Sequence, residues 1–209
     1  FGGWFTGIDG AGNQITSATT VSLTTPHTLY AKWTVNTYTV SYKANGGFNT
    51  MQNSTHTYDI SQSLRANGFS RNGHTFVGWA TSPNGPVEYE DQQPVKNLTS
   101  ENGVTIALYA KWTANEYKVL FDPQEGVVDT TEKQVIFGTA YGTLPTPTRH
   151  GYAFGGWFYG PEGTGPLVTS VTVLNVAYSH ALYAKWTPIS YTVEYNANGG
   201  DDGDTADSA

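Results

Sequence analysis

The hexapeptide Leu-Tyr-Ala-Lys-Trp-Thr occurs three times in this chain of 209 residues, at positions 29–34, 108–113 and 182–187. Its tryptophans, Trp33, Trp112 and Trp186, give spacings of 79 and 74 residues. Each copy is preceded by a Gly-Trp pair, at 3–4, 78–79 and 156–157, and followed by a short aromatic-x-Val-x-aromatic run. A regular spacing of this kind indicates internal repeats, and it constrains the architecture more than any other feature.

The length of the repeat favours separate folding units. Solenoid repeats are typically about 20–45 residues long because one unit cannot bury a core alone, whereas domains of about 55–65 residues often fold independently. We therefore expect beads, each with its own core. The expected boundaries are the C-terminal half of a repeat at 1–36, complete repeats at 37–115 and 116–189, the start of a further repeat at 190–200, and a disordered acidic tail at 201–209.

The complete repeats are named here the second repeat (37–115) and the third repeat (116–189). The connections between repeats, at 34–37, 113–116 and 187–190, are short and contain no Gly/Ser run, so we expect a semi-stiff rod. Because Phe1 to Trp4 matches 154–157 within the third repeat, the chain begins inside a repeat, and we expect it to be a fragment of a longer protein.

Composition and alternation predict a β-rich fold. Aromatic residues make up 14% of the chain and charged residues 13%, with 24 glycines to form turns. The expected strands of the second repeat are 38–42, 56–60, 74–79, 87–89 and 105–112, and in 74–79 alternation puts Thr75, Val77 and Trp79 on one face. Only 61–69 is expected to hold a short helix or turn, so the predicted class is a β-rich α+β fold.

The third repeat is expected to follow the same order. Its predicted strands include 117–121, 135–137, 152–157 and 182–186, and the strand 191–195 should open the next repeat.

Charge excludes several partners. The chain has 10 Lys and Arg against 17 Asp and Glu, a net charge of −7, which argues against nucleic acid and against anionic membrane surfaces. It has no run of 18 apolar residues, so we expect no membrane insertion in this segment. It also has no cysteine, which is compatible with a secreted bacterial surface protein.

The motif tryptophans have two interpretations. Each complete repeat has two of them, and they are Trp79, Trp112, Trp157 and Trp186. They could be a row of sugar-stacking platforms or the core of each bead, and their position at the ends of alternating strands favours the core. Aromatic residues outside the repeated positions are the better candidates for stacking on a carbohydrate, and these are Phe48, Tyr89 and Tyr159.

Two sets of charged residues have both a chemical and a structural interpretation. Lys32, Lys111 and Lys185 occupy one motif position, where an isopeptide crosslink is the functional interpretation, but alternation favours solvated lysines on the outer face. Glu88 and Glu90 would share a strand face as an acid/base pair. Because the matching stretch 167–169 has no acid, a solvated edge is the preferred interpretation.

Other motifs point to no reaction. The five histidines, at 27, 56, 74, 150 and 180, have no metal-site spacing, and Asp201, Asp202 and Asp204 do not form an EF-hand loop. The Gly-rich stretches 7–12 and 160–165 lie between strands, and 144–148 lacks the end of a sortase signal. We therefore expect no catalytic residue, metal or cofactor, and the sequence defines no ligand-binding residue.

The ordered motifs resemble a known family. The order aromatic-x-Val-x-aromatic, Ala-Asn-Gly-Gly, Arg-x-Gly-Tyr-x-Phe-x-Gly-Trp and Leu-Tyr-Ala-Lys-Trp resembles the Listeria–Bacteroides repeat, the family of the internalin B-repeat. It is carried by 38–47, 71–79 and 108–112, and by 117–121, 149–157 and 182–186. The third repeat departs from this order at 122–126, and the second has His74 where the third has Tyr152.

The resemblance implies small β-grasp-like domains in tandem in bacterial surface proteins and adhesins, with neither a shared ligand nor catalysis. We therefore expect a non-catalytic, extracellular stalk or spacer region of a secreted or cell-wall protein. The alternative is a binding module that recognises a glycan or host protein through a repeat surface. Weak self-association through the incomplete repeats at the two ends is also expected.

Overall fold

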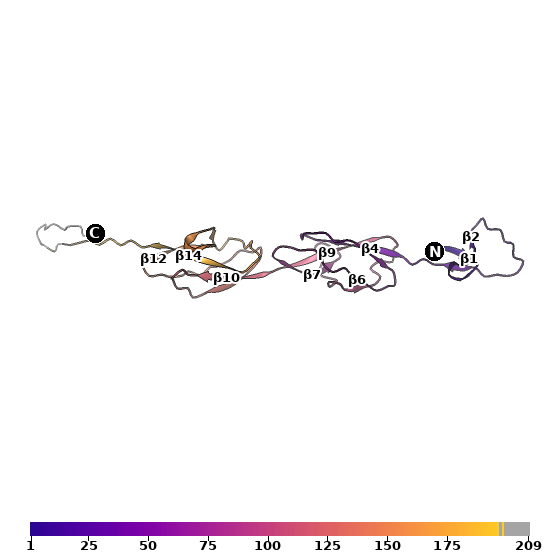
Figure 1. Cartoon of the computed structure of the whole chain (residues 1–209), viewed down its shortest axis with the longest axis horizontal. Helices are drawn as coiled ribbons and strands as arrows, with labels where there is room; N and C mark the ends of the chain where they lie inside the picture. The colour runs from indigo at the N-terminus through magenta and orange to yellow at the C-terminus, as the bar shows by residue number, and fades with distance from the viewer. Residues whose placement is uncertain (197, 199–209) are drawn as a thin grey trace. The chain divides into compact units, whose positions relative to one another are not determined.

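The computed structural model describes residues 1–196 and residue 198. The chain divides into two compact units, Phe1–Ala114 and Asn115–Ala209 (Figure 1). The predicted tail 201–209, together with residues 197, 199 and 200 of the expected further repeat, lies outside the described residues. Residues 190–196 form no strand, although an aromatic-x-Val-x-aromatic run predicted one there.

The second repeat is built on a four-stranded mixed sheet in the order β5-β4-β9-β7. The strands are β4 (Thr37–Lys43), β5 (Ser54–Thr57), β7 (His74–Ala80) and β9 (Thr105–Ala114). The central neighbours β4 and β9 are parallel, with Val40 opposite Ile106, and the two outer strands pair antiparallel with them. A small second sheet joins β6 (Gln62–Ser63) to β8 (Pro94–Val95).

The third repeat has the same arrangement with one additional edge strand, in the order β11-β10-β14-β12-β13. The strands are β10 (Glu116–Asp122), β11 (Glu132–Ile136), β12 (Tyr152–Phe158), β13 (Leu167–Val168) and β14 (His180–Pro188). Here too the central neighbours, β10 and β14, are parallel, with Val119 opposite His180. Figure 1 shows β10, β12 and β14 together in this unit.

The N-terminal residues form a three-stranded sheet in the order β2-β1-β3. Its strands are β1 (Gly3–Phe5), β2 (Gln14–Ile15) and β3 (Tyr30–Lys32). Trp4 is 48% exposed and Trp33 is 74% exposed, whereas the equivalent of Trp4 in the second repeat, Trp79, is 0% exposed. The first and second strands of a complete repeat, which have no counterpart here, therefore contribute much of what covers these indoles.

The predicted face of residues 74–79 is wrong, and a β-bulge is the reason. The register of β7 against β9 shifts between Phe76 and Gly78, so strict alternation ends there. Phe76 and Trp79 consequently turn to the same side, with ring centroids 4.9 Å apart, while Thr75 and Val77 are exposed. Gly78 makes the bulge possible because its φ of +138° is unfavourable for residues with a Cβ. The third repeat has the same shift between Phe154 and Trp157.

The expected short helix at 61–69 is also absent from the structure. That segment contains β6 and irregular chain, and its side chains Leu64 and Phe69 are buried in the core. In the described residues the helical elements are two single 3-10 turns, Ile8–Gly10 and Pro161–Gly163. The fold is therefore β-rich, and the predicted α component is not found among these residues.

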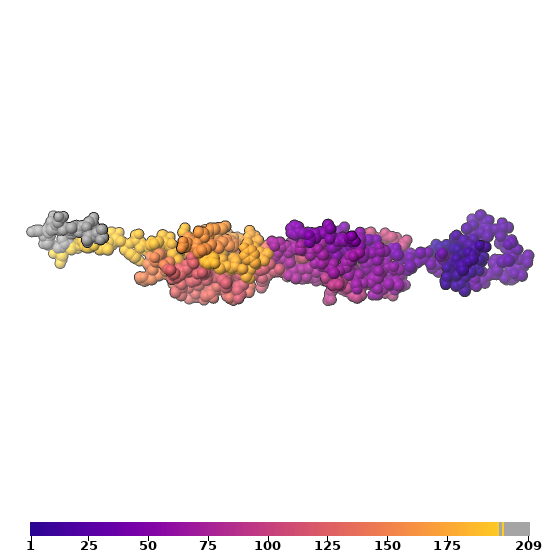
Figure 2. All heavy atoms as spheres, viewed as in Figure 1, coloured from indigo at the N-terminus to yellow at the C-terminus, as the bar shows by residue number. Residues whose placement is uncertain are grey.

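Each complete repeat has a core centred on one tryptophan. Trp79 is surrounded by aromatic side chains, with ring centroids 5.0 Å from Tyr42 and 6.1 Å from Phe69. Trp157 packs against Phe121 and Phe154 in the third repeat. In the space-filling view of Figure 2, the atoms of each complete repeat form a closed surface on the face shown.

Candidate functional site

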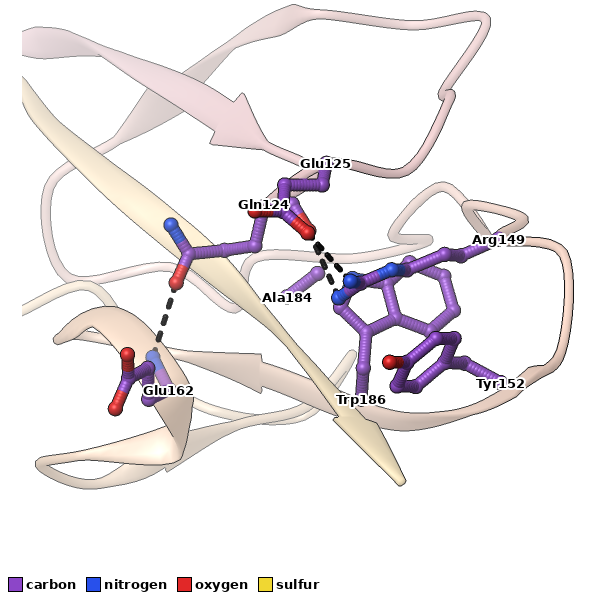
Figure 3. A pocket seen from close by; sticks show the side chains of 7 residues that line it. All are labelled: Gln124, Glu125, Arg149, Tyr152, Glu162, Ala184 and Trp186. Carbon is purple, nitrogen blue, oxygen red and sulfur yellow. Dashed lines mark hydrogen bonds and ion pairs between the residues drawn. The ribbon is translucent and has the colours of Figure 1, made fainter. Parts of the chain in front are cut away.

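A polar hollow of about 500 Å³ lies on the third repeat. It is lined by residues from the turn after β10, the segment before β12, the start of β12, the 3-10 turn Pro161–Gly163 and β14. These residues are Gln124, Glu125, Arg149, Tyr152, Glu162, Ala184 and Trp186 (Figure 3). Two aromatic rings, one amide and three charged groups thus surround one space. It is the strongest candidate for a site in the part of the chain that the structure describes.

The turn after β10 supplies one wall of the hollow. Gln124 and Glu125 both have positive φ, +49° and +68°, which forces the chain to reverse sharply. The carboxylate of Asp122 accepts a hydrogen bond from the backbone N–H of Gln124 at 2.9 Å. The side-chain oxygen of Gln124 in turn accepts from the backbone N–H of Glu162 at 3.0 Å, which joins this turn to the 3-10 turn.

Arg149 forms the opposite wall. Its guanidinium pairs with the carboxylate of Glu125 and lies 3.9 Å from the centroid of the Tyr152 ring (Figure 3). It also reaches the backbone oxygen of Gln124 at 3.5 Å. The positive charge is therefore already balanced by a carboxylate and an aromatic face within the repeat.

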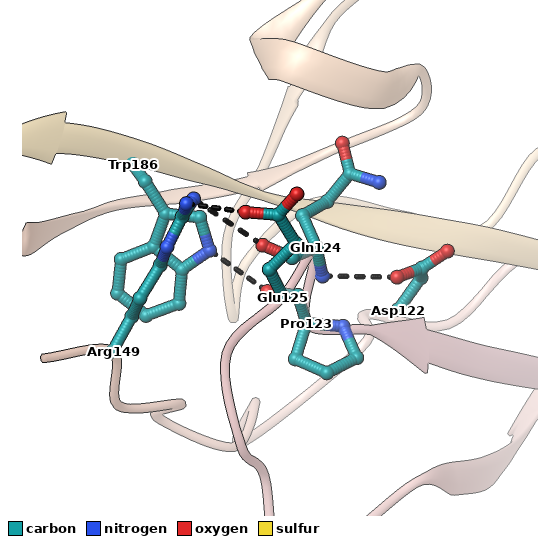
Figure 4. Close-up of polar contacts among 6 residues, drawn as sticks. All are labelled: Asp122, Pro123, Gln124, Glu125, Arg149 and Trp186. Atoms are coloured by element: carbon teal, nitrogen blue, oxygen red, sulfur yellow. Dashed lines mark hydrogen bonds and ion pairs between the residues drawn. The ribbon is translucent and has the colours of Figure 1, made fainter.

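Trp186 anchors the turn from the last strand. Its indole N–H donates to the backbone oxygen of Pro123 at 2.8 Å (Figure 4). A Cβ on Gly126 would lie 2.5 Å from the Trp186 ring, so this ring requires glycine at that position. The second repeat repeats this arrangement, with the Trp112 indole N–H donating to the oxygen of Ala44 at 2.9 Å and Gly47 beneath the ring.

This geometry holds the parts of the repeat together. The guanidinium, the amide and the indole N–H each have a partner inside the repeat. The residues that line the hollow include no serine, threonine, cysteine, lysine or histidine to act as a nucleophile with a base. Nor do three or more His, Asp or Glu side chains come together as metal ligands among the described residues.

A second polar cluster lies in the core of the third repeat. The buried hydroxyl of Tyr141 is hydrogen-bonded to the Tyr159 hydroxyl and to Nε2 of His180, each at 2.7 Å. Burial, followed by the hydrogen bond between the Tyr141 and Tyr159 hydroxyls, raises the pKa of Tyr141. Tyr159 also stacks on the His180 ring at 5.4 Å, so this candidate for carbohydrate stacking is already used inside the repeat.

The other aromatic candidates differ in their exposure. Phe48 is exposed at the edge of the second repeat, where its backbone pairs with Ser70. Tyr89 is half-buried and packs against the core, and burial raises its pKa. The four motif tryptophans divide into two classes, because Trp79 and Trp157 are buried whereas Trp112 and Trp186 are only half-buried.

The charged candidates also have local partners. Glu88 accepts hydrogen bonds from the hydroxyl of Thr81 at 2.6 Å and from its backbone N–H, and these bonds lower the pKa of its carboxyl. The backbone N–H of Glu90 donates to Gln93 instead.

The three motif lysines differ in their surroundings. The ammonium groups of Lys32 and Lys185 lie 5.4 Å and 5.6 Å from the ring centroids of Phe5 and Phe158. Lys111 is half-buried and donates to the backbone oxygen of Pro83 at 3.3 Å.

The remaining motifs that lie within the described residues have structural roles. Residues 7–12 and 160–165 each form a loop around a 3-10 turn, with Asp9 and Glu162 both at a φ of +57°. The segment 144–148 lies against the core, where the oxygen of Pro145 accepts a hydrogen bond from the Trp157 indole. Asp201, Asp202 and Asp204 lie outside the described residues.

Sequence reasoning missed the cluster of Gln124, Glu125 and Arg149. One signal was present, because the third repeat has Glu125 in the position where the second repeat has Gly46. An acid in that position, in a chain that also keeps the Arg-x-Gly motif, makes an ion pair available. The sequence also gave no sign that His56 would be buried, because no repeated motif contains this residue.

The comparisons with known proteins agree with the repeat pattern. The family described as the Listeria-Bacteroides repeat domain matches residues 1–32, 38–111 and 117–185. A protein of Evansella cellulosilytica named "Putative Gly-rich membrane protein" is 31% identical over 205 residues, which are 96% of this chain and 22% of that protein. Internalin H of Listeria monocytogenes is 30% identical over 121 residues, 56% of this chain and 20% of that protein.

A second protein of Evansella cellulosilytica, named "Putative membrane protein", is 29% identical over 85% of this chain and 25% of its own length. The chain thus spans about a quarter or less of the length of these relatives. Among the described residues no helix is long and apolar enough to cross a membrane. Because the family matches most of its length, this chain belongs to the Listeria–Bacteroides repeat family.

Proposed function

We propose that this chain is a non-catalytic spacer region of an extracellular surface protein, in which complete repeats at 37–115 and 116–189 act as successive folding units. The observation that supports it most is that, in the hollow of the third repeat, the Arg149 guanidinium, the Gln124 side-chain oxygen and the Trp186 indole N–H each have a partner within the repeat. Family membership and the names of the relatives support a location at the cell surface.

We class each complete repeat as β-grasp-like. The proposal is supported by a mixed sheet whose first and last strands are central and parallel, and by a crossover segment that buries Leu64 and Phe69 against that sheet. In the second repeat this crossover contains no helix. A solution structure of the chain that placed the first strand at an edge of the sheet would contradict this class.

Binding of the full chain to a glycan and serum-protein array tests the spacer function. A spacer should give no signal above that of an unrelated β-protein of similar net charge. A reproducible, saturable signal for one glycan or one host protein would contradict a pure spacer role.

The hollow of the third repeat favours one second candidate, a binding module for a glycan. Tyr152 and Trp186 line the hollow beside the amide of Gln124, and aromatic side chains with a few polar groups are typical of small-molecule pockets. If the array gives a glycan signal, Tyr152→Ala should abolish it while Phe48→Ala, an exposed aromatic of the other repeat, should leave it unchanged. Equal loss in both variants, or no loss in either, would exclude the hollow as the site.

A further inference from the structure

In both complete repeats the first strand and the last strand are direct neighbours and run parallel. Val40 of β4 faces Ile106 of β9, and Val119 of β10 faces His180 of β14. Because the strands are parallel, the chain enters at the start of one strand and leaves at the end of the other. Entry and exit are therefore at opposite ends of one ladder of hydrogen bonds.

This placement determines how the ladder responds to tension. A pull on the two chain ends moves the first and last strands in opposite directions along their own length. All hydrogen bonds between them are then loaded together, whereas a pull on two strands from the same end loads one bond at a time. A single backbone hydrogen bond contributes little net stability, so simultaneous loading is what makes a short ladder resist force.

We propose that the β4–β9 and β10–β14 pairs are load-bearing clamps, so that each repeat sustains tension along the chain. The inference deepens the proposed spacer function and rests on it for its biological meaning. The load passes through the parallel pair of each sheet, and the remaining strands are not in its path, namely β5, β7, β11, β12 and β13.

Side chains reinforce the clamp from within the core. Tyr42 of the first strand and Leu108 of the last strand are both buried, so sliding one strand past the other would open the packed core. The hydrogen bond from the Trp112 indole to Ala44 also ties the last strand to the turn that ends the first. Trp186 makes the same connection to Pro123 in the third repeat.

The clamp of the second repeat is the longer of the two. Its register covers five residue pairs, from Thr39 opposite Thr105 to Lys43 opposite Tyr109, against four in the third repeat. Two backbone hydrogen bonds extend this clamp where β4 begins. The N–H of Gly103 donates to the oxygen of Thr37 at 2.7 Å, and the N–H of Thr39 donates to the oxygen of Val104 at 2.8 Å. In the third repeat, the N–H of Lys118 donates to the side-chain oxygen of Ser179 at this point.

Single-molecule force spectroscopy on the full chain tests the clamp directly. The chain has no cysteine, so pairs of introduced cysteines fix where the load is applied. In Glu116→Cys/Ile189→Cys the third repeat is pulled from opposite ends of its ladder. In Glu116→Cys/Tyr178→Cys both attachment points are at the same end, and all three replaced side chains are exposed.

We expect the same-end pair to unfold at a force several-fold lower than the opposite-end pair, although both proteins melt at the same temperature. Equal unfolding forces would overturn the clamp. A matched set in the second repeat, Val35→Cys/Glu116→Cys against Val35→Cys/Glu101→Cys, repeats the test if Tyr178→Cys lowers the melting temperature. The opposite-end pair of the second repeat should also unfold at a higher force than that of the third.

These outcomes separate the clamp from the proposed function. Equal forces in both geometries would remove the clamp and leave the spacer role intact. A saturable ligand on the array would contradict a pure spacer role and leave the measured forces unchanged.

Discussion

Among the described residues of the second repeat, the buried indole N–H of Trp79 and Nδ1 of His56 have no hydrogen-bond partner. The third repeat gives the indole N–H of Trp157 an acceptor, the oxygen of Pro145 at 2.8 Å, and has Val135 in the position of His56. The two repeats nevertheless share sheet order, central parallel pairing and bulge. The difference teaches that apolar side chains and a few glycines specify this fold, while its buried polar groups vary between copies.

The two repeats also differ in a polar contact at the surface. Arg149 has a carboxylate partner in Glu125, whereas a Cβ on the matching Gly46 would lie 3.4 Å from the guanidinium carbon of Arg71. The arginine thus lies over the same turn in both repeats, although only one repeat supplies an acid. The ion pair is an addition to the scaffold rather than a requirement for it.

The largest expected effect concerns the central tryptophans. Trp79→Ala or Trp157→Ala should destabilise its own repeat by about 3–5 kcal/mol, and Trp112→Ala should cost less because that ring is half-buried. Urea unfolding followed by circular dichroism should show one early transition for the mutated repeat and an unchanged one for the other. A single displaced transition for the whole chain would mean that the repeats unfold as one unit.

The bulge glycines should differ in their tolerance of alanine. Both have positive φ, so Gly156→Ala should cost about 1–3 kcal/mol. Gly78→Ala should cost more, because its Cβ would lie 2.6 Å from the backbone oxygen of Tyr89, whereas that of Gly156 meets the end of the Leu167 side chain. The exposed Val77→Ala is the control and should change the free energy of unfolding by less than about 0.5 kcal/mol. Equal costs at the two glycines would contradict this account.

Acid should weaken the second repeat through His56. The side chain is 1% exposed, and its burial lowers its pKa in the folded state. The unfolded state therefore binds a proton first as the pH falls below about 6.5, and stability is lost at up to about 1.4 kcal/mol per pH unit until the folded-state pKa is reached.

His56→Val, which copies the third repeat, tests this pH dependence. Between pH 7 and pH 5 the free energy of unfolding of the second repeat should fall less in this variant than in the parent. The difference should equal the contribution of one histidine, as measured by urea unfolding at each pH. The third repeat serves as the internal reference, since the substitution leaves it untouched. An identical pH dependence in the variant and the parent would contradict the role of His56.

The smallest effect is expected at the ion pair. Glu125→Ala removes an exposed pair worth about 0.2–1 kcal/mol, and the loss should diminish at high salt. Glu125→Gly should be nearly neutral, because relief of the positive φ, worth about 1 kcal/mol, offsets the lost pair. Thermal melting at low and high salt distinguishes the two variants. If Glu125→Gly lost more stability than Glu125→Ala, the positive φ of residue 125 would be unimportant at this turn.

Strand positions were predictable where apolar residues alternate or a motif repeats. The predicted strands 38–42 and 105–112 agree with β4 and β9 to within two residues at each end. The strand predicted at 56–60 is wrong by two to three residues, since β5 is the polar run Ser54–Thr57, which has no apolar periodicity. The bulge was missed because alternation assumes a regular pleat, which Gly78 interrupts.

The candidate site was less predictable than the fold. Arg149 was recognised only as part of a motif, and its partner Glu125 lies 24 residues earlier in the chain. Their contact depends on how the turn after β10 reverses, which the positive φ of Gln124 and Glu125 determines. The different burial of Trp79 and Trp112 was equally hidden, because both residues end alternating strands in the sequence.

The parallel pairing of first and last strands also determines when a repeat can fold during synthesis. Val40 meets Ile106 only after the 65 residues between them have been made, and closing so long a loop is slow. Until β9 has left the ribosome, β4 has only the short strand β5 as a neighbour in its sheet, and Trp79 has no β9 to pack against. Each repeat therefore stays unfolded until almost its last residue has emerged, and the copies complete their folding one after another.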